Sequence, residues 1–374
     1  MKTICEHNSC TGCGLCVSLC PVSCITMRIG KLGHLYPTVD MTKCIDCGSC
    51  TKNCPVVNPV DLSESQHAFA AWARDEADYK SSTSGGASSI LAQYIVNHGG
   101  VVYGCAVSPG AIIEHIRIDK IEDLSRIKGS KYVQSSIVKI LPLIRKDIKE
   151  NRTVLFLGTP CQVAAVKKLF SVHPERLYLV DLVCHGVPSQ QSLHDYLNRH
   201  VCLDSVDNVT FRSEEGYLIR AFSNNDIVYC SPELWSCRFK DYYYNAFMDG
   251  FSFRDSCYEC RYASPNRCSD ITIGDFWGLG KEISSEDIPE HRFGISLVLT
   301  NTIVGRTLFQ RVSDTMYCFE RPIVEAVNGN DQLRHPKDKT GKAFVFRSLQ
   351  PLLGDKVAYE FVRILTKVRN RLTR

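Results

Sequence analysis

The sequence predicts two unlike parts in one chain: a small, cysteine-rich α+β module followed by a larger α/β core. Two observations support the first part: a cysteine pattern occurs twice before residue 56, and short alternating stretches with Gly and Pro lie between the two copies over residues 25–43. A third observation supports the second part. From residue 151, short apolar runs alternate with helical stretches and end in Gly/Pro loops, which is typical of an α/β sheet.

The repeated pattern reads C-x2-C-x2-C-x3-C-P. It comprises Cys10, Cys13, Cys16 and Cys20 before Pro21, and Cys44, Cys47, Cys50 and Cys54 before Pro55. This is the spacing of bacterial two-cluster ferredoxins, in which three nearby thiolates bind one cluster and the fourth reaches across to the other. We therefore predict two [4Fe-4S] clusters, one on Cys10, Cys13, Cys16 and Cys54 and the other on Cys44, Cys47, Cys50 and Cys20.

Structural zinc and disulfides are the alternatives for these cysteines. Zinc sites usually take two cysteine pairs per ion rather than three evenly spaced thiols and a Cys-Pro step. Disulfides require an oxidising compartment. Iron–sulfur clusters are therefore the favoured interpretation, and Cys5 and Cys24, outside the pattern, are expected to be plain buried thiols.

The composition is that of an ordinary soluble protein. Of 374 residues, 44% are hydrophobic and 22% charged, and the formal charge of +4 does not indicate a nucleic-acid partner. The first residues contain no apolar signal-peptide core, and no run of eighteen apolar residues indicates a spanning helix. We expect a cytoplasmic, reducing location, and the oligomeric state stays open.

Two loops after the module have the composition of anion sites. Residues 56–66 read as a linker and residues 67–74 as a strand, and the Ser81–Ser89 loop then leads into a helix over residues 90–98. Backbone amides at such a helix start can hold an anion, although a Ser-rich N-cap is the simpler alternative. The Lys128–Gln134 loop carries two cations and an aromatic ring. It could hold a phosphate or a flat ring, or be a solvated turn before a helix over residues 135–150.

The core contains five more cysteines that are candidate ligands. The strands predicted over residues 154–157 and 177–183 end in loops that contain Cys161 and Cys184, and ligands of α/β sheets bind at this edge. Cys257 and Cys260 form a C-x2-C pair that Cys161 and Cys184 could complete, with Cys268 as a competitor for any of these places. A lone cysteine in such a loop is more often buried filler.

The remaining segments are less informative. They predict a hairpin over residues 206–222, core packing of the aromatics within residues 235–253, a buried strand over 294–300 and a helix over 304–312. Residues 355–374 predict an amphipathic helix with a basic face that includes Lys356, Arg363, Lys367, Arg369, Arg371 and Arg374. This helix either docks on the core or contacts an acidic partner or a membrane surface.

Six segments in one order resemble the coenzyme F-420 hydrogenase/dehydrogenase beta-subunit family over residues 65–330. They are Ser84-Gly85-Gly86, Lys128 to Tyr132, Gly158 to Gln162, Cys184-His185-Gly186, Cys257-x2-Cys260 and Asp270 to Asp275. The resemblance implies an α/β core that binds FAD and, in many members, a further [4Fe-4S] cluster, here on Cys161, Cys184, Cys257 and Cys260. We discount Cys268 as a ligand, because the family is expected to vary there.

The resemblance also suggests where FAD would bind. Its phosphates would lie at Ser84, Gly85, Gly86 and Lys131, and its ring near Gly158, Thr159, Pro160 and Gln162. Tyr132 is a further candidate for binding the cofactor. His185 is a candidate proton donor, although a loop histidine satisfied by the backbone is the simpler interpretation. The chain departs from the archaeal hydrogenase subunits because it carries its own dicluster module and the aromatic sequence Asp275-Phe276-Trp277-Gly278.

The function expected from these observations is that of an oxidoreductase. It would pass electrons between ferredoxin-type clusters and FAD, and on to coenzyme F-420 or another small organic two-electron acceptor, with a redox protein or ferredoxin as partner. The alternative is a non-catalytic electron carrier in a larger complex. The predicted division is a ferredoxin domain over residues 1–60, the core over 65–150 and 151–330, and a basic tail over 331–374.

Overall fold

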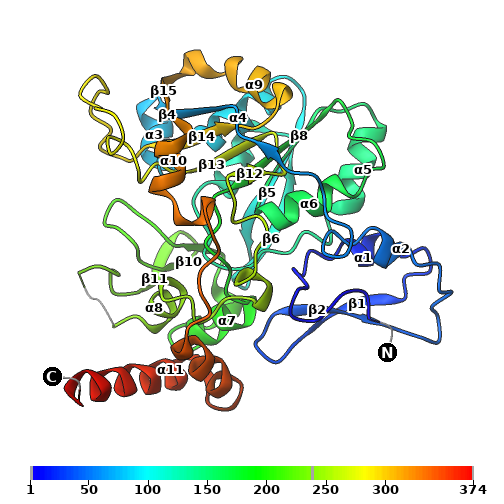
Figure 1. Ribbon diagram of the computed structural model, residues 1–374, viewed down its shortest axis with the longest axis vertical. Helices are drawn as coiled ribbons and strands as arrows, with labels where there is room; N and C mark the ends of the chain where they lie inside the picture. Colours follow the sequence, from blue (N-terminus) through cyan, green and yellow to red (C-terminus); the bar gives the residue numbers. More distant parts are fainter. Residues whose placement is uncertain (1–2, 237–239, 373–374) are drawn as a thin grey trace.

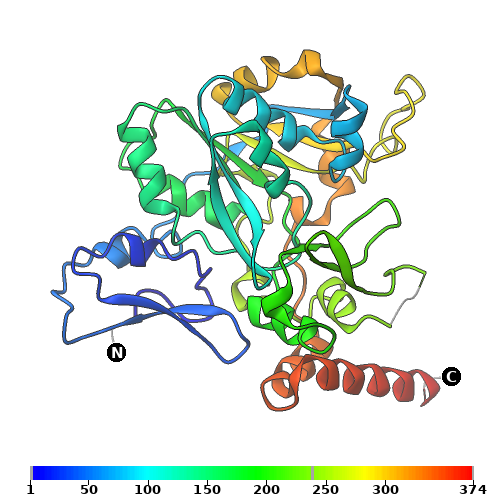
Figure 2. The same ribbon diagram turned by 180° about the vertical axis from the view of Figure 1, so that it is seen from behind.

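The computed structural model describes residues 3–236 and 240–372. The N-terminal module lies at one side of a larger core, against α5 and α6 (Figures 1 and 2). In the module, α1 (Leu15–Ser18) and α2 (Ser49–Lys52) lie beside a hairpin of β1 (Ile25–Ile29) and β2 (Leu35–Val39). Gly14 and Gly48 both have a φ of 71° immediately before these helices. The two copies of the motif therefore share one backbone turn, and glycine permits its left-handed conformation.

Eight strands form one mixed sheet in the described part of the core, in the order β15-β4-β14-β13-β8-β7-β5-β6. Their bounds are β4 His67–Ala73, β5 Val101–Ser108, β6 Ile112–Ile118, β7 Val154–Gly158, β8 Leu177–Leu182, β13 Ile271–Asp275, β14 Ser296–Thr300 and β15 Met316–Arg321. Strands β5, β7, β8 and β13 run parallel, and the outer pairs are antiparallel. The predicted fold class of an α+β module and an α/β core is confirmed at this level.

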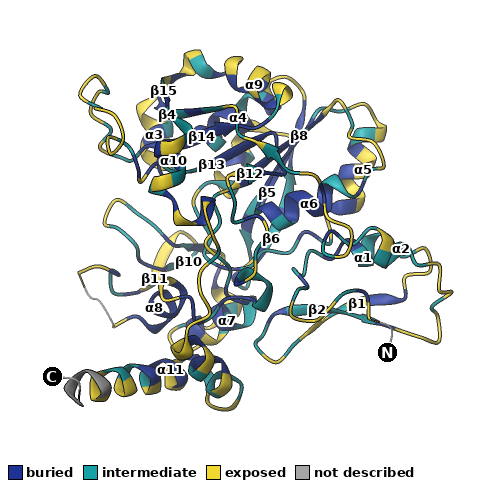
Figure 3. Cartoon of the chain, viewed as in Figure 1, coloured by how far each residue is buried: buried dark blue, intermediate teal, exposed yellow. Residues whose placement is uncertain are grey.

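Helices cover the sheet and bury its apolar residues. Neighbours in one strand divide between two clusters: Leu155 packs with α4 and α9, whereas Val154 and Phe156 pack with α5 and α6. The inner strands β7 and β14 are wholly buried, the edge strands β6 and β15 are only partly buried, and the N-terminal module is mostly half-buried or exposed (Figure 3). The helix bounds are α3 Glu76–Ser81, α4 Ala87–Asn97, α5 Leu141–Lys149, α6 Pro160–Lys167, α9 Ile303–Gln310 and α10 Ile323–Gly329.

A third group of elements packs below the sheet (Figure 1). It comprises α7 Gln190–Leu197, β9 Asn208–Thr210, β10 Arg220–Ser223, β11 Asp226–Cys230, α8 Tyr242–Met248 and α11 Gly341–Leu372. Tyr242, Tyr243 and Tyr244 are buried here, as predicted for core aromatics. The short elements are β3 Ser63–Glu64, β12 Asn266–Arg267 and the 3₁₀ turns η1 Ile121–Ile127, η2 Leu203–Ser205, η3 Asp255–Cys257, η4 Ser313–Thr315 and η5 Asp331–Leu333.

Three of the element predictions need correction. The helix expected over residues 135–150 begins at Leu141, because residues 135–140 are partly extended and Ser136 bridges to Glu114 of β6. Helix α6 begins at Pro160 and not at residue 163, where the apolar pattern predicts the start of a helix over residues 163–170, because Thr159 and Gln162 form a capping box there. The hairpin expected over residues 206–222 is shorter, and β11 adds a strand beyond it.

The C-terminal helix presents an apolar stripe to solvent. Gly354 interrupts α11 with a φ of 78°, and the second half then docks on the core through Ala358, Tyr359 and Val362. The exposed stripe, spaced for one helix face, consists of Val357, Phe361, Ile364, Leu365 and Val368. The side chains of Arg369, Arg371 and Arg374 lie outside the described residues. Nowhere in residues 3–236 and 240–372 is a helix both long and apolar enough to span a bilayer, and surface contact with a membrane stays a prediction.

Candidate functional site

A cavity of about 510 Å³ lies at the carboxyl ends of β7, β8 and β13. Its lining includes Gly158 and Thr159 after β7, Cys184 and His185 after β8, and Asp275 at the end of β13. The carboxyl ends of parallel strands leave backbone groups and loops free for a ligand. The structure therefore places both predicted strand-end loops around one cavity.

The Lys128–Gln134 loop gives this cavity a buried cation. Lys128 pairs with Asp78 and donates to Ser81 Oγ at 2.8 Å, so its charge is compensated. The ammonium of Lys131 donates to the carbonyl of Lys128 at 2.7 Å, and no carboxylate of the described residues lies within ion-pairing distance of it. Burial lowers the pKa of Lys131. A cavity anion would therefore find an uncompensated positive charge here.

The serine- and glycine-rich loop contributes mainly through its backbone. Ser84 lines the cavity, but its hydroxyl donates to the carbonyl of Ile295 at 2.6 Å. A Cβ on Gly85 would lie 2.1 Å from the carbonyl oxygen of Ala71, so this glycine permits the loop to pack on the sheet. Gly86 has a φ of 80° and no side chain caps α4, which disfavours the Ser-rich N-cap. Ser88 and Ser89, in the first turn of α4, line the cavity.

The loop after β7 is fixed by hydrogen bonds within the protein. Gln162 accepts from the backbone N–H of Thr159 at 3.0 Å and donates to Ser135. Gly158, Thr159 and Gln162 line the cavity, whereas Pro160 is buried as the first residue of α6 and lies outside the lining. This loop therefore has a rigid shape before any ligand binds.

Aromatic side chains surround the other part of the cavity. Tyr132 packs on Tyr217 and Phe247, and Arg212 lies over the ring of Tyr217 while pairing with Asp275 at 3.0 Å. Trp235 and Trp277 also line the cavity and are about half exposed, so they lie where it opens to solvent.

Two histidines line the cavity, and the sequence indicated only one of them. Burial lowers the pKa of His185, the predicted candidate. His115 on β6 bonds through Nε2 to the carbonyl of Leu157 at 2.8 Å, and its Nδ1 is buried without a partner in the protein. Burial lowers the pKa of His115 to about 4, so the ring is neutral at neutral pH. The alternating pattern of β6 was the signal that could have placed His115 on the sheet face.

The structure brings four core cysteines together: Cys161 in the first turn of α6, Cys184 in the loop after β8, Cys257 at the end of η3 and Cys260 shortly after it. Burial raises the pKa of Cys161 to about 12 and of Cys184 to about 11, and nearby Cys260 contributes to both shifts. Burial also raises the pKa of Cys257, with further contributions from Cys184, Cys260 and Cys161. Mutual proximity and burial disfavour four separate thiolates unless a metal supplies positive charge.

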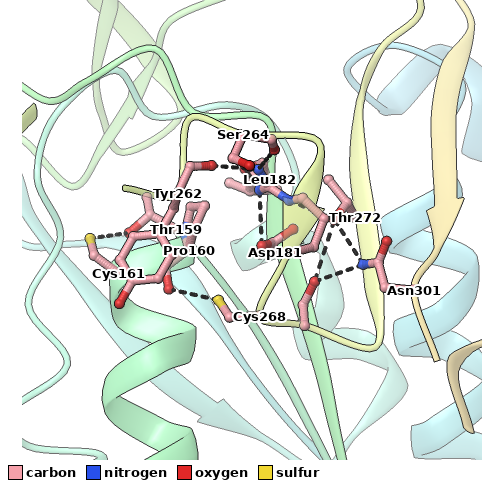
Figure 4. Close-up of polar contacts among 12 residues, drawn as sticks. Thr159, Pro160, Cys161, Asp181, Leu182, Tyr262, Ser264, Cys268, Thr272 and Asn301 are labelled. Carbon is pink, nitrogen blue, oxygen red and sulfur yellow. Dashed lines mark hydrogen bonds and ion pairs between the residues drawn. The ribbon is translucent and has the colours of Figure 1, made fainter. Parts of the chain in front are cut away.

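A buried ion pair lies in the same region of the core, among the polar contacts drawn in Figure 4. Arg267 and Asp181 pair at 2.9 Å with side-chain exposures of 1% and 0%. Arg267 also donates to the carbonyl of Tyr262 at 2.7 Å, which ties the loop after Cys260 to β8. Cys268 is buried nearby, but its thiol donates to the carbonyl of Pro160, as a structural thiol would.

The eight motif cysteines fall into two spatial groups. Burial raises the pKa of Cys13 to about 12, with contributions from Cys10 and Cys54. Burial also raises the pKa of Cys16, with contributions from Cys13, Cys10 and Cys54. The second group surrounds a small cavity of about 20 Å³, whose lining includes Cys20, Cys44, Cys47 and Cys50. These are the two groups that the spacing predicts.

Cys5 and Cys24 lie close to these groups. The pKa of Cys10 is lowered to about 6, first by a hydrogen bond from Cys5, and Cys54 is affected in the same way. Cys24 is buried and lies 3.4 Å from the sulfur of Cys20. No three His, Cys, Asp or Glu side chains in the described ranges converge as closely as a single metal ion requires. A [4Fe-4S] cluster is larger than a single ion, so cysteines that lie too far apart for one ion can still bind a cluster.

Fold and site together define an iron–sulfur type of protein, with a dicluster module joined to an α/β core that contains a ligand cavity. Residues 9–58 match the family of 4Fe-4S dicluster domains. Residues 151–326 match the family that describes the C-terminal part of the beta subunit in coenzyme F420 hydrogenase/dehydrogenase. The resemblance inferred from the motifs is confirmed over residues 151–326, and the dicluster module is confirmed over residues 9–58.

Among solved structures, the chain is similar to one from "Xenon derivatization of the F420-reducing [NiFe] hydrogenase complex from Methanosarcina barkeri". The two are 20% identical, with a TM-score of 0.48, and the match covers 83% of this chain and 94% of that chain. None of the curated proteins matches this chain.

Proposed function

We propose that this chain is an iron–sulfur flavoprotein that passes electrons between [4Fe-4S] clusters and FAD, and on to a small two-electron acceptor. Coenzyme F420 is one candidate acceptor, and another organic molecule is the alternative. The observation that carries the proposal is the cavity beside the four core cysteines, in a chain with a dicluster domain and an F420 hydrogenase/dehydrogenase beta-subunit domain. The proposed extents are residues 1–60 for the ferredoxin part, 65–150 and 151–330 for the core and 331–374 for the tail.

Three clusters would be bound by the three thiol groups. The donor sets suit iron, because each contains four cysteines and thiolate is the ligand that Fe–S clusters require. The ferredoxin sets are Cys10, Cys13, Cys16 and Cys54, and Cys20, Cys44, Cys47 and Cys50. The core set is Cys161, Cys184, Cys257 and Cys260.

The first ferredoxin group and the core group share one apolar cluster. Cys13, Cys161 and Cys260 are half-buried and pack against one cluster of buried residues, which includes residues of α5 and α6. Apolar packing between the two thiol groups excludes water and lowers the local dielectric constant. This arrangement supports electron exchange between the ferredoxin part and the core.

The cavity fits a dinucleotide with a flat ring. Lys131 would pair with the diphosphate, and the backbone at Ser84 and the first turn of α4 would face the same group. Gly85, Gly86 and Pro160 would shape the loops without contacting the ligand. Tyr132, Gly158, Thr159 and Gln162 would surround the ring. Bound FAD would supply the conversion between single electrons and electron pairs.

Polar side chains near the ring would control protons and position the acceptor. His185 is the candidate proton donor, and its lowered pKa means that it is neutral near pH 7. The half-exposed Trp235 and Trp277 at the cavity opening offer flat surfaces to an incoming acceptor.

An anaerobic electron-transfer assay tests the proposal. Protein reconstituted with iron, sulfide and FAD is reduced with dithionite, freed of excess reductant and mixed with coenzyme F420 or other two-electron acceptors. The proposal expects flavin-dependent reduction of one of these acceptors. A protein that holds eight irons, binds no flavin and reduces only one-electron partners would instead be an electron carrier.

A further inference from the structure

Arg254 is buried where the N-terminal module meets the core. Its side chain is 1% exposed. It donates to the carbonyl of Cys10 at 2.6 Å, to the carbonyl of Leu35 at 2.9 Å and to Oε1 of Gln134 at 3.2 Å. The guanidinium also lies 4.2 Å from the centroid of the Tyr36 ring. One arginine of the core thus binds three segments, two of them from the module.

The charge of Arg254 has no carboxylate partner, unlike that of the other buried arginines. Within the described ranges, Arg267 pairs with Asp181, Arg321 with Glu325, and Arg347 with Asp255. For Arg254 no carboxylate lies within ion-pairing distance in these ranges, although it is the most deeply buried of the four.

The charged groups around Arg254 do not supply the missing anion. Asp255, the next residue, is already bound by Arg347 and by Lys339. His34 is buried beside it and is neutral, because burial lowers its pKa to about 3. A buried charge without a counter-ion costs several kcal/mol, and carbonyl acceptors offset this only in part. The junction therefore lacks one anion.

The thiols next to Arg254 indicate which anion this is. Arg254 donates to the carbonyl of Cys10 at 2.6 Å, which places its charge beside the first ferredoxin group. Arg254 is not among the residues that line the small cavity beside Cys20, Cys44, Cys47 and Cys50. A cluster bound by four thiolates carries net negative charge, which increases when the cluster is reduced.

We propose that Arg254 is the buried counter-cation of the cluster that Cys10 would hold, and that it raises the reduction potential of this cluster. This inference rests on the proposed function. The guanidinium stabilises the reduced, more negative cluster and at the same time fixes the module on the core. Arg254 is therefore a positioning and potential-setting residue at the junction through which electrons enter or leave the core.

Redox titration followed by electron paramagnetic resonance tests this role, in anaerobically reconstituted full-length protein. Arg254→Gln should shift the potential of the Cys10 cluster to more negative values and leave the cluster of Cys20 unchanged. Arg254→Lys retains the charge and should retain most of the potential. The Cys16→Ser variant identifies the signal of the Cys10 cluster, because it alters the spectrum of that cluster. The signal whose potential shifts in Arg254→Gln should be the same one.

A second pair of variants separates charge from structure. Gln134→Glu places a carboxylate beside the intact guanidinium and should also lower the potential of the Cys10 cluster. Gln134→Met loses both side-chain hydrogen bonds of Gln134, the one accepted from Arg254 and the one donated to the carbonyl of Thr11, without adding charge, and should have little effect. If Arg254→Gln does not take up clusters, the difference in potential between Gln134→Glu and Gln134→Met tests the inference instead.

Equal potentials in Gln134→Glu, Gln134→Met and the wild type, with full iron content, would overturn the inference. So would an unchanged potential in a fully loaded Arg254→Gln protein. A wild type without iron would instead overturn the proposed function, and this inference with it.

Discussion

In the N-terminal module the cysteines lie on short loops around a few apolar residues, whereas the core cysteines lie on loops of a large buried sheet. The cluster that packs against most of the module's cysteines contains only four buried residues, Ile4, Cys24, Ile25 and Val39. Cys161 and Cys184 of the core instead follow the largely buried strands β7 and β8, and the ion pair of Arg267 and Asp181 ties the loop after Cys260 to β8. Burial of apolar surface is the main source of stability, so the two regions should depend differently on their clusters.

This difference predicts which cysteine site has its shape before metal binds and which site takes its shape only when metal binds. A region with few buried apolar residues gains much of its folding free energy from metal binding. A region fixed by a sheet keeps its shape without metal. We expect the module to fold with its clusters and the core to present a preformed site.

The largest effect should follow removal of iron. Chelation under anaerobic conditions should abolish hydrogen-exchange protection in β1 and β2, because metal binding and folding of the module are coupled. Protection in β5, β7 and β8 should persist. Equal loss of protection in both regions would contradict the comparison.

Loss of the core cluster alone should be the next largest effect. Cys257→Ala should lower the iron content from about twelve to about eight per chain, because one four-iron cluster is lost, while bound FAD remains. Cys268→Ala is the matched control: it removes a buried thiol of the same region that donates to a carbonyl, and should keep all the iron. Equal iron content in the two variants would remove the core cluster from the proposal.

The buried ion pair of the core should be costly to break from one side. Asp181→Asn leaves Arg267 buried without its counter-ion and should lower the free energy of unfolding by about 3–5 kcal/mol. Denaturant unfolding of the core measures this. Asp181→Asn combined with Arg267→Met should recover part of the loss, and a double variant as unstable as the sum of its parts would speak against this pair.

Flavin binding should depend on the cation in the cavity. Lys131→Met should weaken FAD binding by about ten- to a hundredfold, because a charge-assisted hydrogen bond contributes about 1.5–3 kcal/mol. Equilibrium dialysis of the deflavinated protein measures this affinity. Lys139→Met removes an exposed lysine paired with Glu114 and serves as control; equal affinities in both variants would separate Lys131 from the flavin.

The smallest effect concerns the exposed stripe of α11. If this face contacts a membrane surface, the full chain should float partly with anionic vesicles, and less so at high salt. Phe361→Glu combined with Ile364→Glu should abolish flotation, because both side chains belong to the exposed stripe. Flotation that is unaffected by salt and by these substitutions would rule out this role for α11.

Local patterns made the module and the parallel strands predictable. The cysteine repeat is complete within a short stretch, and buried runs such as residues 154–157 and 177–183 became β7 and β8. The loop with Lys131 was indicated by its composition, and it does line the cavity.

Features that depend on distant segments were not predictable. The role of Arg254 depends on its hydrogen bonds to Cys10, Leu35 and Gln134, which are all distant from it in the sequence. Gly85 looked like part of a ligand loop, but the sheet packs against it. Strand β15 was not predicted, because its pairing with β4 comes from the far end of the chain.

The most direct test of the account is the iron, sulfide and flavin content of protein purified anaerobically. The account predicts about twelve iron atoms and one FAD per chain, corresponding to three four-iron clusters and a flavin in the cavity. Eight irons with FAD would contradict the proposed core cluster but would agree with the proposed flavin-dependent enzyme. Eight irons and no FAD after reconstitution would contradict the central claim and leave an electron carrier.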